Sequence, residues 1–328
     1  MKRLTIGVAL LTAAAVAAPV LRADVKTKEK TLVNIEGVLG GFVRFFGGSA
    51  MKDGITSTVA VKGNRKAQIS DISGQIVDLT EQKVYLLDMK KKEYTVQTFA
   101  ELRAAFEKAR AEAAKQKAEM KPEDKQQVED ASKQFEFDAK VEETGQKKNV
   151  AGYDAREVVV TVTGHEQGKT VEAAGGFVMT NTMWIGPKIA AIDERRDFEV
   201  RFVRAVYGES LLVEMQQQMA QLSVMYPSFG KMLERSQTES KKMNGTTLST
   251  SSVFEVVRSE EQLKQAQQQS QSSGGGGIGG MIGRRVAGNR GQPQARTKVM
   301  TTTVDLLSVE TTVTAQDVAM PAGFKEKK

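Results

Sequence analysis

Few residues in this chain of 328 could carry covalent or redox chemistry. It has no cysteine, which excludes disulfides, thiolate nucleophiles, Fe–S clusters and cysteine-based zinc sites. Its single histidine, His165, cannot form a site that needs several histidines. His165 stands among polar residues in 163–168, with no evident partner to orient its ring, so we expect an exposed turn residue.

Three sequence motifs match active-site patterns only by their letters. The glycines of 275–280 have the spacing of the dinucleotide-binding fingerprint, but they follow a glutamine-rich run rather than a strand. The Ser-x-x-Lys pair of penicillin-binding enzymes occurs twice, at 49–52 and 228–231, without its accompanying elements. The sequence therefore predicts a protein that is not an enzyme and holds no cofactor or metal.

Two apolar features are more informative than these motifs. The glycine-rich connection 37–48 contains three phenylalanines, which is unusual for a loop in solvent, so it either packs as a lid or exposes a patch for a membrane or partner. Four methionines lie within the stretch 215–232. Methionine is flexible and polarizable, so this set indicates either an adaptable apolar groove or ordinary core filling.

Residues 1–23 are typical of a secretory signal peptide. A basic start is followed by an almost wholly apolar stretch over 4–18 and then by small residues. We expect cleavage after Ala23, with Ala17 or Ala18 as alternatives; the competing interpretation is an uncleaved anchor. No later segment approaches about 18 consecutive apolar residues, so we expect no transmembrane span.

The charge of the mature chain argues against a nucleic-acid partner. Removing residues 1–23 takes away three basic residues and no acidic one, which leaves 44 Lys and Arg against 40 Asp and Glu, a net charge of +4. That excess is too small to indicate nucleic-acid binding. An exported chain without cysteine is most simply interpreted as a bacterial, periplasmic protein.

The hydrophobic periodicity predicts one α+β domain over 24–328. Strand patterns, about ten in all, fall in 24–89, 134–143, 154–163, 176–185, 245–258 and 298–312. Helical spacing predicts helices over 98–118 and 193–235, the second broken at Gly208 and Pro227. Hairpin-linked strands with two helical interruptions favour a single antiparallel sheet covered by helices.

Residues 260–296 differ in composition from the rest of the domain. They are rich in Gln, then Gly, then Arg, and cannot bury enough apolar surface to fold. We expect a disordered loop within the domain.

Several stretches resemble a strand–turn–strand pattern of secreted bacterial proteins of unknown function allied to the LolA-type lipoprotein carriers. They are Lys62-Gly63-Asn64-Arg65-Lys66, Ile76-Val77-Asp78-Leu79, Lys83-Val84-Tyr85-Leu86-Leu87-Asp88, Lys91-Lys92-Glu93-Tyr94, Gly152-Tyr153-Asp154-Ala155-Arg156-Glu157-Val158, Met183-Trp184-Ile185 and Met320-Pro321-Ala322-Gly323-Phe324-Lys325. The resemblance implies a curved antiparallel half-barrel whose concave face is covered by helices over an apolar cavity. In the carriers that cavity shelters acyl chains, and the family supplies no catalytic residue.

The sequence thus predicts an exported protein that binds a hydrophobic ligand, an acyl chain or lipidated partner, between sheet and helices. Each buried CH₂ group would contribute roughly 0.8 kcal/mol. The residues expected to line the site are Phe42, Phe45, Phe46, Phe202, Met215 and Met219. The alternative is an envelope scaffold that binds a partner protein through its Phe-rich or Gly-rich loop.

Overall fold

The computed structural model describes residues 24–36, 53–119, 121, 123, 135–265 and 294–327. These residues form a mixed α+β fold built on one sheet of 12 strands, which confirms the predicted fold class. The expected signal peptide, the Phe-rich connection and residues 266–293 of the expected loop lie outside the described residues. Residues 260–265, at the start of that loop, are helical.

The strands are β1 (Val25–Ile35), β2 (Ile55–Lys62), β3 (Arg65–Ser70), β4 (Ser73–Asp78), β5 (Lys83–Asp88), β6 (Glu93–Thr98), β7 (Phe135–Val150), β8 (Tyr153–Glu166), β9 (Gly176–Gly186), β10 (Thr246–Val257), β11 (Arg296–Glu310) and β12 (Lys325–Glu326). The helices are α3 (Phe99–Glu119), α5 (Val171–Ala174), α6 (Ala190–Met225), α7 (Pro227–Lys242) and the 3₁₀ turn η1 (Gln316–Val318). The expected number of about ten strands was therefore too low. β6 is a short strand directly before a helix, and β12 has only two residues, too few to show a period.

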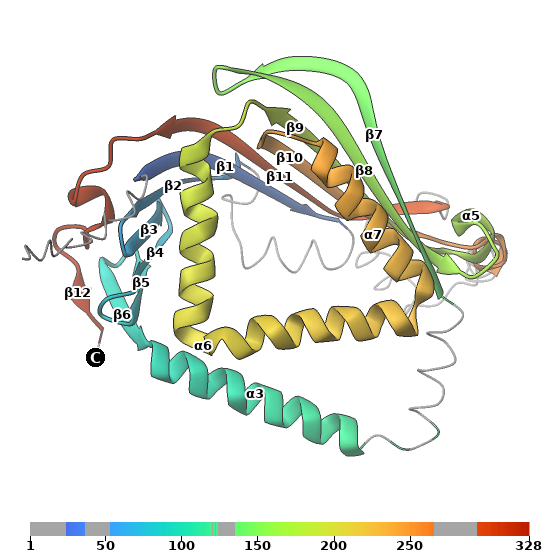
Figure 1. Cartoon of the computed structure of the whole chain (residues 1–328), viewed down its shortest axis with the longest axis horizontal. Coiled ribbons are helices and arrows are strands. Elements are labelled where there is room, and N and C mark those ends of the chain that lie inside the picture. The colour runs from blue at the N-terminus through green and yellow to red at the C-terminus, as the bar shows by residue number, and fades with distance from the viewer. Residues whose placement is uncertain are drawn as a thin grey trace, which may run out of the picture.

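The strand order is β12-β6-β5-β4-β3-β2-β1-β11-β10-β9-β8-β7, so β12 and β7 are the two edges of an open sheet. All neighbouring strands are antiparallel except β12 and β6, which pair in parallel and depart from the expected antiparallel arrangement. Figure 1 shows the sheet as an arch with α3, α6 and α7 on its inner side. We call this side of the sheet the inner face and the opposite side the outer face.

The end of the sheet formed by β2–β6 is covered on both faces. On the inner face, Val77 and Val84 pack with residues of α3 and α6. On the outer face, Ile76 and Leu87 pack against the segment after β11, through Val313 and Val318 around η1. Both faces of β5 are therefore covered at Val84 and Leu87, which are 2% and 4% exposed, whereas Leu86 is 36% exposed.

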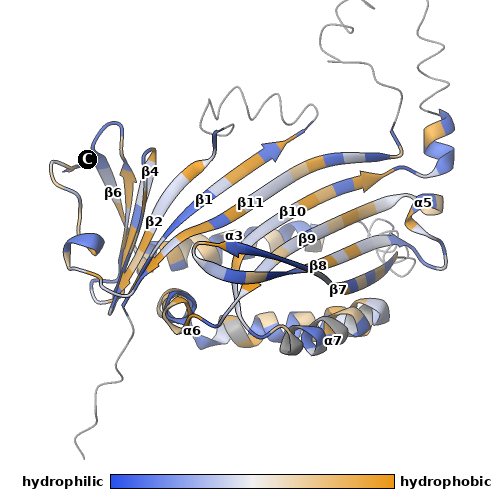
Figure 2. Ribbon diagram, turned by 90° about the horizontal axis from the view of Figure 1, so that it is seen from above, coloured by the Kyte–Doolittle hydropathy of each residue, from blue (hydrophilic) through white to orange (hydrophobic). Residues whose placement is uncertain are grey.

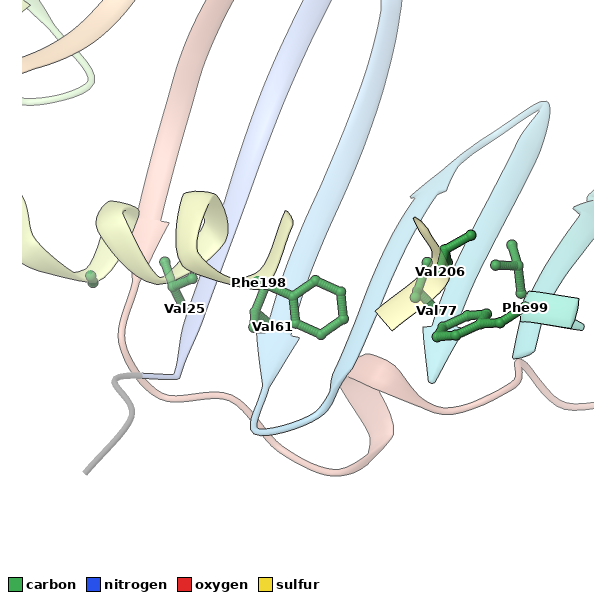
Figure 3. Packing of buried hydrophobic residues seen from close by; sticks show 8 residues of the cluster. Val25, Val61, Val77, Phe99, Phe198 and Val206 are labelled. Carbon is green, nitrogen blue, oxygen red and sulfur yellow. The ribbon is translucent and has the colours of Figure 1, made fainter. Parts of the chain in front are cut away.

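The main apolar core lies between α6 and the inner face of the first strands. Figure 3 shows Phe198 of α6 beside Val25 and Val61, and Phe99 of α3 beside Val77. All five side chains are at most 1% exposed. Full burial of side chains of this size stabilises a fold by roughly 1.5–3 kcal/mol each, so this core fixes the first half of α6 on the sheet.

Charged side chains add a second set of contacts between α6 and the inner face. Arg195 donates from Nη1 to Oγ1 of Thr27 over 2.9 Å and forms an ion pair with Glu29. Lys66 of β3, only 7% exposed, forms an ion pair with Glu199. Because buried charges are costly unless they are paired, these contacts favour a single placement of the helix.

α6 changes direction at Gly208, where φ is 79° and ψ is 172°. Glycine adopts this conformation without strain, whereas a side chain would oppose it. The bend leaves carbonyl groups of the preceding turn without helical partners, and Arg103 of α3 donates to two of them. Its Nε is 2.7 Å from the oxygen of Val206 and its Nη2 is 3.2 Å from that of Ala205. The predicted breaks at Gly208 and Pro227 are both confirmed.

Replacing Arg103 should weaken this bend. We expect Arg103→Met to lower the free energy of unfolding by about 1 kcal/mol, because two carbonyl groups lose a charged donor. The control is Arg110→Met on the same helix, which breaks an exposed ion pair with Glu214 and should cost about 0–0.5 kcal/mol. Urea titration of the two variants measures both losses, and equal losses would contradict the assigned role of Arg103.

Candidate functional site

α6 and α7 contact the inner face at two separate places. α6 packs on β1 and β2, and α7 packs on β7. Strands β8 to β11 lie between these contacts in the sheet order. Figure 2 shows both helices on the same side of the sheet. These four strands therefore present an inner surface that lies between the contacts of α6 and those of α7.

The strand register places three rows of side chains on this surface, because paired residues of neighbouring strands project from the same face. Each row takes one residue from β1, β11, β10, β9 and β8, in that order. The middle row is Val33, Thr302, Ser252, Asn181 and Val160. One flanking row is Ile35, Met300, Phe254, Met179 and Val162, and the other is Thr31, Val304, Thr250, Met183 and Val158. We call these three rows the inner patch. Most of its members are apolar.

Most side chains of the inner patch are only half-buried. Val160, Met179 and Met183 fall in this class, and Met300 is 40% exposed. By contrast, Val61 of β2 and Val77 of β4 on the inner face are fully buried beneath α6. The inner patch thus keeps apolar surface that another apolar molecule could cover.

The outer face directly behind the inner patch is rich in hydroxyl groups. The residues concerned are Thr161, Thr180, Thr182, Ser249, Ser251, Thr301 and Thr303. Ser249 also donates a hydrogen bond to Oδ1 of Asp305 over 2.7 Å. Threonine keeps the β-branched shape that suits a strand while offering a polar group. The two faces of these strands therefore differ in polarity, and the apolar one lies on the side of the helices.

One polar pair lies in the centre of the inner patch. The hydroxyl of Ser252 donates to Oδ1 of Asn181 over 2.6 Å. The amide group of Asn181 has two N–H donors of its own, which can bind a carbonyl or carboxylate oxygen. The inner patch thus combines an apolar surface with one hydrogen-bonding group.

An aromatic cluster borders the inner patch at the α7 side. The ring of Phe137 lies 6.2 Å from that of Tyr226 and 5.8 Å from that of Phe229, both in edge-to-face arrangements. Phe177 lies 6.3 Å from Phe137 and 5.7 Å from Phe254 of the inner patch. Such ring pairs contribute about 0.5–1.5 kcal/mol each beyond area burial. They hold α7 against β7.

Gly164 makes room for these rings on β8. A Cβ atom there would lie 2.4 Å from Cε1 of Phe177 and 2.7 Å from Cε1 of Phe135. Real carbon atoms do not approach so closely, so a side chain at this position would push the rings apart.

The six residues predicted to line a ligand site are not gathered in one place by the described residues. Phe202 of α6 packs against the core between α6 and the sheet, with its ring centre 5.4 Å from that of Phe99. Met215 and Met219 lie on the second half of α6 and are 54% and 38% exposed. The other three, Phe42, Phe45 and Phe46, are outside the described residues.

The motifs with active-site spacing gain no support. Ser228, of the second Ser-x-x-Lys match, accepts a hydrogen bond at Oγ from the backbone N–H of Phe137 over 3.4 Å, which is a structural contact with β7. The first match and the glycines of 275–280 lie outside the described residues. Within the described ranges, no three His, Asp or Glu side chains are grouped as a metal site.

His165 is not the exposed turn residue that we expected. It lies near the end of β8, is 6% exposed, and places Nε2 3.0 Å from Oδ2 of Asp138 and Nδ1 3.1 Å from the carbonyl oxygen of Glu166. Burial alone would lower the pKa of His165, but these two hydrogen bonds raise the pKa above its ordinary value. The prediction failed because Asp138 is 27 positions away and becomes a neighbour only through strand pairing.

The inner patch and the aromatic cluster were not predicted either. Phe177 and Phe229 contact Phe135 and Phe137 of β7, although they come from distant parts of the sequence. The order of the strands and the packing of α7 on β7 bring these rings together.

Comparisons with protein families, with curated proteins and with solved structures found no match to this chain. Within the described part of the chain, no helix is long and apolar enough to cross a membrane. The function must therefore be argued from the inner patch and its surroundings.

The close contacts of Gly164 lead to a stability prediction. We expect Gly164→Ala to lower the free energy of unfolding by about 1–3 kcal/mol, as overpacking of a tight site does. Urea unfolding followed by circular dichroism measures the change. An unchanged midpoint would show that the Phe135 and Phe177 rings move aside freely.

The environment of His165 leads to a pH prediction. Since its folded-state pKa is raised, the charged form stabilises the fold below about pH 6.5, the ordinary histidine value, and this contribution is lost as the pH rises through the folded-state pKa. Because Asp138 is largely exposed, the effect should be small. We expect His165→Gln to flatten this part of the pH profile of unfolding. A wild-type profile with no decline across this range would contradict the assignment.

Proposed function

We propose that this protein binds a hydrophobic ligand on the inner patch, with an acyl chain or a lipidated partner as occupant. The observation that carries the proposal is a half-exposed apolar surface on β1 and β8–β11, bordered by α6 on one side and α7 on the other. The hydroxyl-rich outer face behind it offers no comparable surface.

The energetics favour an elongated apolar ligand. Each CH₂ group removed from water contributes roughly 0.8 kcal/mol, so a long chain lying along the rows gains enough to offset its loss of freedom. The Asn181 amide would bind the polar end or a polar group of the same molecule.

The second half of α6 supports an adaptable site. Met215, Met219 and Leu222 recur at intervals of four and three residues, which places them on one stripe of the helix. They are 54%, 38% and 36% exposed. Methionine side chains adjust to ligands of different shape, which suits a site that binds acyl chains.

The curvature of the sheet is compatible with the finer description suggested by the sequence resemblance. In that description the protein is a half-barrel whose concave face is covered by helices, similar to the LolA-type carriers, and it is exported to the periplasm. The long α6–α7 excursion and the segments 37–48 and 260–296 are additions to the pattern of the carriers, so the proposal is ligand binding rather than transfer between partners.

The first test is native mass spectrometry of residues 24–328 purified from the periplasm without detergent. We expect additional mass that is lost on denaturation and is identified as lipid. A bare polypeptide mass that persists after incubation with envelope lipids would contradict ligand binding and favour the alternative, an envelope scaffold.

Two adjacent valines on β8 provide a matched pair of variants. Val160 lies in the inner patch, whereas Val159 projects from the outer face, and both are half-buried. We expect Val160→Glu to weaken binding of radiolabelled palmitate by at least about tenfold, because a buried carboxylate beside the acyl chain is costly. Val159→Glu should bind palmitate as the wild type does. Equal loss in the two variants would place the ligand elsewhere.

A further inference from the structure

A pocket of about 950 Å³ lies at the turn end of the β7–β8 hairpin. Its walls come from both strands of the hairpin, from the end of β9 with Pro187, and from Asn244 before β10. This volume is in the range of small-molecule sites and exceeds what an inorganic ion needs. None of the residues of the inner patch lines it.

The pocket is basic. Lys147, Lys148 and Arg156 line it, against one acidic side chain, Asp154. Lys147 and Arg156 are direct cross-strand partners in the register of β7 and β8. Like charges in such positions repel each other and destabilise the pairing. An anion between them would convert this repulsion into attraction.

The hydrogen-bonding capacity of Arg156 is only partly used. Its Nη2 donates to the carbonyl oxygen of Asn244 over 3.2 Å. Its Nε is buried and has no acceptor in hydrogen-bonding geometry among the described residues, with Oε1 of Glu143 3.5 Å away. A guanidinium group offers five N–H donors in a planar fork that suits carboxylate and phosphate oxygens.

The two lysines differ in their surroundings. Lys148 places Nζ 4.1 Å from the ring centre of Trp184, a cation–π contact that holds this side chain. Lys147 is exposed, and its side chain forms no hydrogen bond or ion pair with another described residue. It is therefore able to turn towards a bound anion without losing an existing contact.

We infer that this pocket is a binding site for an organic anion that carries a phosphate or carboxylate group. Lys147 and Arg156 bind the anionic group, and Tyr153, Ile185 and Pro187 contact the remainder of the molecule. The same chemistry is offered by a soluble organic phosphate and by the headgroup of an anionic lipid. This site is separate from the inner patch, so it does not rest on the proposed acyl-chain binding.

The chain carries its own reporter for this site. Trp184 is the single tryptophan, and it lies beneath Lys148 and next to Ile185, both of which line the pocket. We expect its fluorescence to change in a saturable way on titration with glycerol 3-phosphate, or with vesicles of phosphatidylglycerol but not of phosphatidylcholine. A response to glycerol 3-phosphate assigns a soluble ligand, and a response only to the anionic vesicles assigns a lipid headgroup. No saturable change with either probe would overturn the inference.

Charge-removing variants test the residues. We expect Lys147→Gln and Arg156→Gln each to weaken binding roughly tenfold or more, as loss of a charge-assisted hydrogen bond does. The matched control is Lys140→Gln, which removes the same charge from an exposed ion pair with Glu142 on the same strand and should leave binding unchanged.

Lys147 is exposed, so its variant tests the site even if Arg156→Gln does not fold. Equal weakening by Lys140→Gln would show a response to overall charge and would overturn the site. Palmitate binding should be unaffected by Lys147→Gln, which separates this test from that of the inner patch.

Discussion

The bend of α6 at Gly208 determines which part of the inner face the described helices cover. The helix has 36 residues and would extend about 54 Å if it were straight. Its first half is fixed to β1 and β2 by the buried core around Phe198, and the positive φ of Gly208 then turns the chain away from that core. After Pro227 the chain returns along α7 to β7. Figure 1 shows this path as three sides of a frame beneath the arch of the sheet.

The two ends of this path are held against the sheet by different kinds of interaction. α6 is fixed by fully buried apolar side chains together with ion pairs from Arg195 and Glu199. α7 is held by ring contacts of Tyr226 and Phe229 that remain partly exposed. Segments with fewer buried contacts open at lower free energy, so the α7 side is the weaker of the two borders of the inner patch. An apolar ligand would reach the patch most easily from that side.

The sequence predicts the local elements well because their signals are local. Helical spacing from Phe99 onward, the glycine at 208 and the proline at 227 each act within a few residues, and the structure has α3, the bend and the start of α7 at these positions. β7 is longer than predicted, since its second half is charged and exposed and shows no apolar face.

What the sequence does not predict depends on which strands become neighbours. Phe202 has helical spacing consistent with a ligand-facing stripe, yet it packs on Phe99 because α3 crosses beneath that part of α6. The inner patch arises from residues of five strands separated by up to 273 positions, the distance from Thr31 to its partner Val304. Apolar alternation shows that each strand has two unlike faces, but not which faces combine into one surface.

The pairing of β1 with β11 has a consequence for how the chain reaches its native state. Lys26 is paired with Glu310, so the sheet is continuous only after nearly the whole chain is available. Contacts between residues so distant in sequence form slowly, because the chain loses the entropy of the long loop between them before the contacts stabilise the fold. Until then β1 is an unpaired edge of the β1–β6 unit, and the outer face of that unit lacks the Val313–Val318 cover. Slow closure of this kind leaves the unpaired strand edge and the uncovered apolar face exposed during folding, which are the features through which partly folded chains aggregate.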